Sequence, residues 1–252
     1  MNMIKRIIWF VATMLFRIVR WIVASVWRLV CKKRGKDAHD KVQLWEGGPY
    51  WATTNIGAEK PEDFGHYFWW GDTVGYKREN DKWVASDGSA AGFTFSFEEG
   101  NAPTCGKTSS YLLEAGWITA DGVLKQEHDA AHVKWGGAWR MPTKQEIDDL
   151  YKKCDWSCGS MNGVNGYIFR GKGSYASGSI FLPCAGSGRK SSLENVGVSG
   201  VYWSAVPKLV ERGYVCGSAY ALIIRQDMCF KKAAYGGLYI GYSVRPVQDY
   251  TE

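Results

Sequence analysis

The sequence predicts an α+β domain of short, twisted antiparallel strands, one or two helices and long loops. Three observations lead to this class. Short apolar runs of strand composition alternate with Gly, Pro, Asn and Asp turns. One strongly signalled helix lies near the middle of the chain. The 252 residues include 30 Gly and 13 Trp, which favour tight turns and aromatic packing over a helical bundle.

The best-defined helix is predicted over residues 144–153. Thr143 stands as its N-cap and Glu146 follows three residues later, which is the pattern of a capping box. Residues 74–110, rich in Gly, Ser, Asn and Lys, are expected to be irregular. The predicted strands share an aromatic or β-branched composition and cover residues 50–56, 66–73, 166–170, 179–183, 200–204, 219–225 and 242–247.

The charge is concentrated at the N-terminus. Residues 1–36 hold nine Lys and Arg and no Asp or Glu, whereas the whole chain has a net charge of +6 and the remainder therefore −3. An acidic main domain is not expected to bind nucleic acid. The sequence predicts a basic helix over residues 1–36, a polar linker over 37–42 and a main domain over 43–252.

Residues 4–30 form a continuous apolar run interrupted by arginines. On a helical wheel Arg6, Arg17, Arg20 and Arg28 fall within about 80°, and the rest of the circumference is apolar. Three interpretations stay open: a helix lying in a membrane surface, a membrane-spanning anchor, and a helix that self-associates or docks on a partner. The first two predict a membrane-associated protein, with the side of the membrane undecided.

Local motifs indicate no enzyme, metal site or cofactor. His128 and His132 have a spacing that can bind zinc on a helix, but Asp129 stands where a zinc protease needs Glu. Seven cysteines are an odd number without disulfide-type spacing, which predicts mostly reduced, buried thiols.

The region 219–240 predicts a binding surface. Strand periodicity assigns Tyr220, Leu222 and Ile224 to a core face and Ala221, Ile223 and Arg225 to the opposite, exposed face. Residues 226–240 show no periodicity, which is typical of a surface free of packing constraints. An ordinary variable loop is the alternative interpretation.

Several long strings resemble one family. WATTNIGAEKPEDFGHYFWWGDT at 51–73, DAAHVKWGGAWRMPTKQEIDDL at 129–150, SIFLPCAGSGR at 179–189, YWSA at 202–205 and GYSVRPV at 241–247 are similar to the Fibrobacter succinogenes major paralogous domain family. The resemblance covers about residues 43–248. It implies a C-type lectin-like fold related to the formylglycine-generating enzyme, with a structural frame that includes Trp139, Arg140, Trp203 and Arg245.

Members of this family also serve as variable proteins of diversity-generating retroelements. The resemblance therefore implies a non-enzymatic protein that displays a variable surface over about residues 200–240 to a protein or glycan ligand, on a phage or bacterial surface. The implied contact residues are Tyr202, Tyr214, Ala221, Ile223, Arg225, Asp227, Met228, Phe230, Tyr235, Tyr239 and Ile240.

Two alternatives accompany this interpretation. Gln226, Met228 and the two lysines at 231–232 cannot arise from an AAC codon by adenine changes alone, so the chain can also be a fixed surface or phage structural protein of the same fold. An oxidase related to the formylglycine-generating enzyme would need a copper-binding cysteine pair, for which Cys216 and Cys229 are the candidates.

Overall fold

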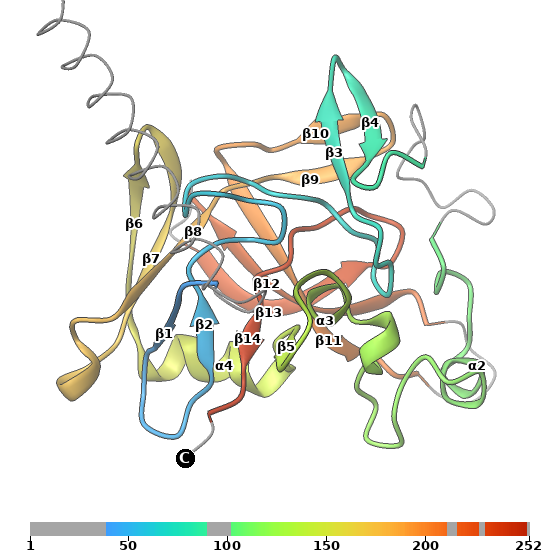
Figure 1. The fold of residues 1–252 in the computed structure, drawn as a ribbon, viewed down its shortest axis with the longest axis horizontal. Helices are drawn as coiled ribbons and strands as arrows, with labels where there is room; N and C mark the ends of the chain where they lie inside the picture. Colours follow the sequence, from blue (N-terminus) through green and yellow to red (C-terminus); the bar gives the residue numbers. More distant parts are fainter. Residues whose placement is uncertain (1–38, 90–101, 211–215, 227–229, 251–252) are drawn as a thin grey trace, which may run out of the picture. The chain divides into compact units, whose positions relative to one another are not determined.

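The computed structural model describes residues 39–89, 102–210, 216–226 and 230–250, with the side chains of 230–233 left aside. The chain divides after Ala38, and the unit from His39 onward contains every described residue. This unit is α+β, as predicted: short antiparallel strands form several small sheets, and the helices lie in the lower half of the view in Figure 1. The predicted basic helix over residues 1–36 lies outside the described residues.

The first sheet joins both ends of the described unit. Its strands lie in the order β1 (Lys41–Gln43), β2 (Tyr50–Ala52), β14 (Val247–Gln248) and β5 (Trp139–Arg140), all antiparallel. β1 begins inside the predicted linker 37–42, and His39 stacks on the indole of Trp135 with ring centroids 3.6 Å apart. The linker prediction was therefore too long, because a short polar strand carries little apolar pattern.

Two three-stranded sheets form the body of the domain. One has the order β6 (Asp155–Met161), β7 (Val164–Arg170) and β8 (Ser179–Pro183). The other has the order β11 (Ser199–Pro207), β12 (Ser218–Arg225) and β13 (Phe230–Gly237). β13 falls in the region where the sequence showed no periodicity, and it pairs with β12 along its whole length.

Two hairpins lie in segments for which the sequence predicts no strands. β3 (Tyr76–Glu79) and β4 (Lys82–Ala85) lie in the stretch predicted to be irregular, and β9 (Ser187–Arg189) pairs with β10 (Ser192–Glu194). Asn80 and Asp81, with φ of 48° and 59°, form the two-residue turn between β3 and β4. Such a turn needs positive φ at both positions, which Asn and Asp tolerate.

Three α-helices and two 3₁₀ turns are present among the described residues. α4 (Lys144–Lys153) matches its prediction, and the Thr143 and Glu146 side chains form both halves of the capping box. The other helical elements are α2 (Ser109–Glu114), α3 (Ala130–Trp135), η1 (Gln126–His128) and η2 (Gly173–Tyr175). No helix of the described residues has the length and apolar content to cross a membrane.

The predicted strand 242–247 is wrong as a continuous strand. Tyr242 and Ser243 make isolated bridges to Phe68 and Tyr202, and regular pairing begins only at Val247. Pro246 has no N–H to donate to a ladder, which is consistent with the break before Val247. The predicted strands 50–56 and 66–73 are likewise reduced, to β2 and to isolated bridges at 67 and 68.

β11 and the middle of β12 are packed on both faces of their sheet. On one face Trp203 and Ala221 belong to a core cluster that also contains Phe68, Trp70 and Val244. On the other face Tyr202, Leu222 and Ile224 pack with α4 and with the β6–β7–β8 sheet. A third, aromatic cluster lies under the β3–β4 hairpin and contains Tyr67, Trp69, Tyr76 and Trp83. Alternating residues of β12 thus serve two different cores.

Candidate ligand-binding surface

Arg245 holds three separated segments together in the interior. Its guanidinium is 1% exposed and donates hydrogen bonds to Asn55 Oδ1 at 2.8 Å, to the Ala52 carbonyl at 3.0 Å and to the Phe181 carbonyl at 2.9 Å. Burial lowers its pKa to about 10, and the neighbouring Tyr202 opposes that shift. A cation in this position serves the fold, since the three acceptors it satisfies belong to the protein itself.

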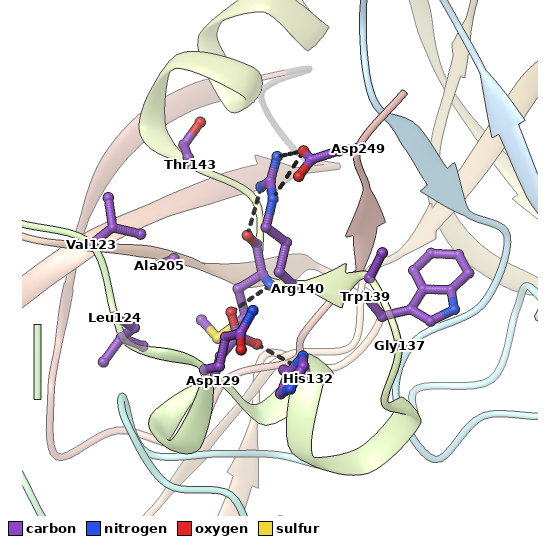
Figure 2. Close-up of a pocket in the computed structure, with 13 residues that line it drawn as sticks. Val123, Leu124, Asp129, His132, Gly137, Trp139, Arg140, Thr143, Ala205 and Asp249 are labelled. Atoms are coloured by element: carbon purple, nitrogen blue, oxygen red, sulfur yellow. Dashed lines mark hydrogen bonds and ion pairs between the residues drawn. The ribbon is translucent and has the colours of Figure 1, made fainter. Parts of the chain in front are cut away.

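A cavity of about 410 Å³ lies between α3, β5 and β11 (Figure 2). Asp129 reaches into its wall and is 3% exposed. One carboxylate oxygen accepts the amide N–H groups of Ala131 and His132, at 2.8 and 3.2 Å, and the other accepts that of Met141 at 2.8 Å. Burial raises the pKa of Asp129, and these three amides oppose the rise.

Arg140 crosses the upper part of this cavity. Its guanidinium pairs with both oxygens of Glu146, at 2.9 and 2.6 Å, and with Asp249, and it also reaches the Met141 carbonyl at 3.2 Å. Figure 2 shows the indole of Trp139 on the side away from Val123. The donors of Arg140 and the carboxylate of Asp129 are therefore hydrogen-bonded within the protein, and both side chains link neighbouring segments at the cavity wall.

The structure contradicts two of the predicted contact residues. Tyr202 is 1% exposed, and its hydroxyl donates to the Pro183 carbonyl. Ala221 is fully buried against the cluster of Trp203. The face of β12 predicted to be exposed is largely covered: Ala221 belongs to the core cluster that also contains Ile56 and Leu112, and Ile223 is half-buried against it. Period-two alternation identifies one buried face of a strand, but it does not show that the opposite face is exposed to solvent.

The remaining predicted residues divide into three groups. Ile223 and Ile240 are half-buried against the same cluster, and Tyr239 packs beside the aromatic cluster. Arg225 is half-buried, and its carbonyl accepts the Tyr167 hydroxyl at 2.9 Å. Tyr235 is exposed by 45%. The predicted contacts at 214, 227 and 228 lie outside the described residues, and Phe230 is described only as the first residue of β13.

Tyr235 belongs to an exposed aromatic pair that the sequence did not predict. It lies directly across the β12–β13 ladder from Tyr220, with ring centroids 4.7 Å apart and rings tilted by 42°. The two hydroxyls are joined by a hydrogen bond of 3.1 Å, and this hydrogen bond is the main cause that raises the pKa of Tyr220. The strand periodicity assigns Tyr220 to the core, but in the structure it is only partly buried, near the start of β12.

Two lysines flank the tyrosine pair. Lys208 Nζ lies 4.4 Å from the ring centroid of Tyr235, and Lys144 Nζ lies 5.3 Å from that of Tyr220. Both distances are within the range of a cation–π contact. We name the surface formed by Lys144, Tyr220, Tyr235 and Lys208 the tyrosine–lysine patch.

The scaffold holds this patch in place. Lys144 is the first residue of α4, whose Ile147 and Leu150 are buried in the core. The amide of Lys208 donates to the Ser218 carbonyl at 2.9 Å, and the Cys216 thiol donates to the Lys208 carbonyl at 3.0 Å. A side chain on such fixed backbone loses less freedom when it binds a partner.

A second tyrosine–lysine group provides a comparison within the molecule. Tyr250 is 46% exposed, its ring centroid is 6.1 Å from that of Tyr50, and Lys41 Nζ lies 4.6 Å from the Tyr50 centroid. Here, however, Lys41 donates to Gln248. In the tyrosine–lysine patch Lys144 pairs with Asp148 at 2.6 Å, whereas Lys208 makes no ion pair with any described residue.

The residues considered for chemistry serve packing in the described part of the chain. Cys216 is fully buried and burial raises its pKa, which does not favour the thiolate that a copper site needs. Cys229 lies outside the described residues. His128 stacks on Trp117 with ring centroids 3.8 Å apart. Among residues 39–89, 102–210, 216–226 and 230–250, no three His, Cys, Asp or Glu side chains form a group that could hold a metal.

Comparison with known proteins gives no relative to assist this assignment. No family model matches the chain, and neither a curated protein nor a solved structure matches it. The α+β unit and the geometry of its exposed groups are therefore the observations on which a function has to be based.

Proposed function

We propose that the chain is a non-enzymatic binding protein whose C-terminal sheet displays contact residues on a C-type lectin-like scaffold. The observation that carries this proposal is the tyrosine–lysine patch: the exposed Tyr235, the partly exposed Tyr220 and two lysines on a backbone fixed by buried neighbours. Tyrosine supplies a large, amphipathic contact area at low entropic cost, and for that reason it is frequent in binding surfaces.

The position of the patch supports this function. Tyr220, Tyr235 and Lys208 fall within residues 200–240, which the resemblance to retroelement variable proteins marks as the variable surface. The predicted frame residues of the same domain are buried: Trp203 is fully buried and donates from its indole to the Phe68 carbonyl at 2.8 Å, and Arg245 is 1% exposed. A rigid frame beneath exposed side chains would let those side chains vary without loss of the fold.

The burial pattern revises which positions would vary. Tyr202 and Ala221 would stay fixed because each is enclosed in a core. Variation would concentrate at exposed or half-exposed positions, of which Tyr220 and Tyr235 are the clearest. In this proposal residues 4–30 place the domain at a membrane surface or in an oligomer, since an amphipathic basic helix suits either role.

The test is to sequence the 3′ end of the gene and its flanks in many individuals of one population. We expect substitutions crowded into codons 200–240, with codons 220 and 235 variable and codons 202 and 221 constant, and a near-repeat of this region beside a reverse transcriptase gene. A uniform 3′ end without a template repeat would overturn diversification and leave a fixed binding or structural protein.

A further inference from the structure

We propose that the tyrosine–lysine patch recognises an acidic segment of a protein partner, with a partner carboxylate bound by Lys208 against the ring of Tyr235. This inference rests on the proposed binding function and names the chemistry of its ligand. Three observations carry it: the charge at the patch, the way the tyrosine rings are covered, and the rigidity of the backbone beneath them.

The charge at the patch is positive in an otherwise acidic domain. Residues 37–252 have a net charge of −3, yet the patch holds two lysines, Lys144 and Lys208, and only Lys144 makes an ion pair with a described residue. Asp148 is paired with Lys144 at 2.6 Å. Lys208 therefore keeps its charge available to a ligand, and the complementary group is an anion.

The rings favour a carboxylate ligand over a sugar. A sugar stacks on an open, flat aromatic face, but each ring here has a lysine ammonium over one face and the two rings are inclined by 42°. Their hydroxyls are joined by a 3.1 Å hydrogen bond, so each phenol also presents an acceptor or donor at the rim. An acidic side chain can reach Lys208 Nζ and accept from a tyrosine hydroxyl at once.

The rigidity of the patch supports specific recognition. Lys208 is held by backbone hydrogen bonds to the start of β12, and Tyr220 and Tyr235 occupy opposed positions of one ladder. Binding an acidic segment would order few groups beyond those already fixed, which preserves more of the interaction energy as affinity.

The experiment uses the full chain and a fluorescein-labelled glutamate oligomer as probe. Fluorescence anisotropy gives the affinity at several salt concentrations, and carbodiimide cross-linking with mass spectrometry identifies the lysines that contact the probe. We expect Lys208 to be the principal cross-linked lysine of the domain. We also expect Lys208→Gln and Tyr235→Ala each to weaken binding by about fivefold, an effect that salt diminishes.

The second tyrosine–lysine group supplies matched controls. Lys41→Gln and Tyr250→Ala remove the same chemistry from the other group and are expected to leave affinity unchanged. Because every variant keeps the basic residues 1–36, binding of the probe to that segment contributes equally to all of them. Far-ultraviolet circular dichroism of each variant confirms that the fold is kept.

Two results would overturn the inference. One is a Lys208→Gln variant that loses no more affinity than Lys41→Gln. The other is a heparin fragment that binds through Lys208 and Tyr235 more tightly than the glutamate oligomer, which would assign the patch to a polysaccharide. Neither result affects the test of the proposed function. A diversified 3′ end in a protein that does not bind the glutamate oligomer would overturn the acidic ligand alone. A uniform 3′ end in a protein that does bind the oligomer would overturn diversification alone.

Discussion

The cavity around Asp129 and Arg140 and the tyrosine–lysine patch use similar polar groups in opposite ways. In the cavity, three backbone amides donate hydrogen bonds to the carboxylate of Asp129, and two carboxylates form ion pairs with the guanidinium of Arg140. At the patch, Lys208 makes no ion pair with any described residue and Tyr235 is 45% exposed. The polar groups that line the cavity are therefore paired within the protein, whereas Lys208 and Tyr235 at the patch are the groups through which we propose that a partner binds.

This comparison predicts that buried polar groups dominate stability. Arg245→Ala removes three hydrogen bonds from the interior and leaves the acceptors at Asn55, Ala52 and Phe181 without a donor. We expect it to lower the free energy of unfolding by about 3 to 4 kcal/mol, measured by urea denaturation. Arg170→Ala, at an exposed position, is the control and should change it by less than about 0.5 kcal/mol. Equal effects of the two variants would break the comparison.

The second prediction concerns the buried face of β12. Ala221 is fully buried opposite Trp203 in the ladder, so Ala221→Leu has no space for its added atoms. We expect a loss of about 2 to 3 kcal/mol from overpacking, measured in the same denaturation assay. A variant of undiminished stability would show that this face is open, as the strand alternation alone had predicted, and would return Ala221 to the contact residues.

Asp129→Asn should have a smaller effect. The amide keeps only one acceptor oxygen for three N–H groups, and we expect a loss of about 1 to 2 kcal/mol at neutral pH. Burial raises the folded-state pKa of Asp129, so the folded protein binds a proton more readily than the unfolded chain. The contribution of this carboxyl to stability therefore falls as pH rises through its folded-state pKa.

The variant lacks that titration, which gives a second readout. The stability difference between the parent and Asp129→Asn should be larger at about pH 4.5 than at pH 7. Unfolding curves at both pH values check the sign. A difference that shrinks on acidification would mean that the three amide hydrogen bonds outweigh burial and hold the pKa of Asp129 below its usual value.

The smallest effect on stability is expected at the patch itself. Tyr235→Ala removes a half-exposed ring, and we expect a change within about 0.5 kcal/mol, close to that of Tyr250→Ala. Thermal denaturation of both variants measures it. A loss of more than about 2 kcal/mol for Tyr235→Ala alone would identify the tyrosine pair as part of the core and would oppose its role as a contact surface.

The fold and the candidate site were predictable to different degrees. Thr143 and Glu146 signalled α4 because a capping box is a local interaction between residues three apart. β7 and β8 were recognisable for a similar reason, since their apolar runs are continuous in the sequence. The tyrosine–lysine patch was only partly predicted: Tyr235 was named, but Tyr220 was assigned to the core and neither lysine was considered.

The sequence by itself determined the α+β class, the helix over 144–153 and the concentration of positive charge before residue 37. These follow from short-range periodicity, capping and composition. Only the tertiary structure decided that Ala221 faces a second core and that Tyr220 lies beside Tyr235. Burial of the second face of a strand depends on which distant segments pack on it, and cross-strand neighbours depend on register; neither is encoded in the periodicity of one strand.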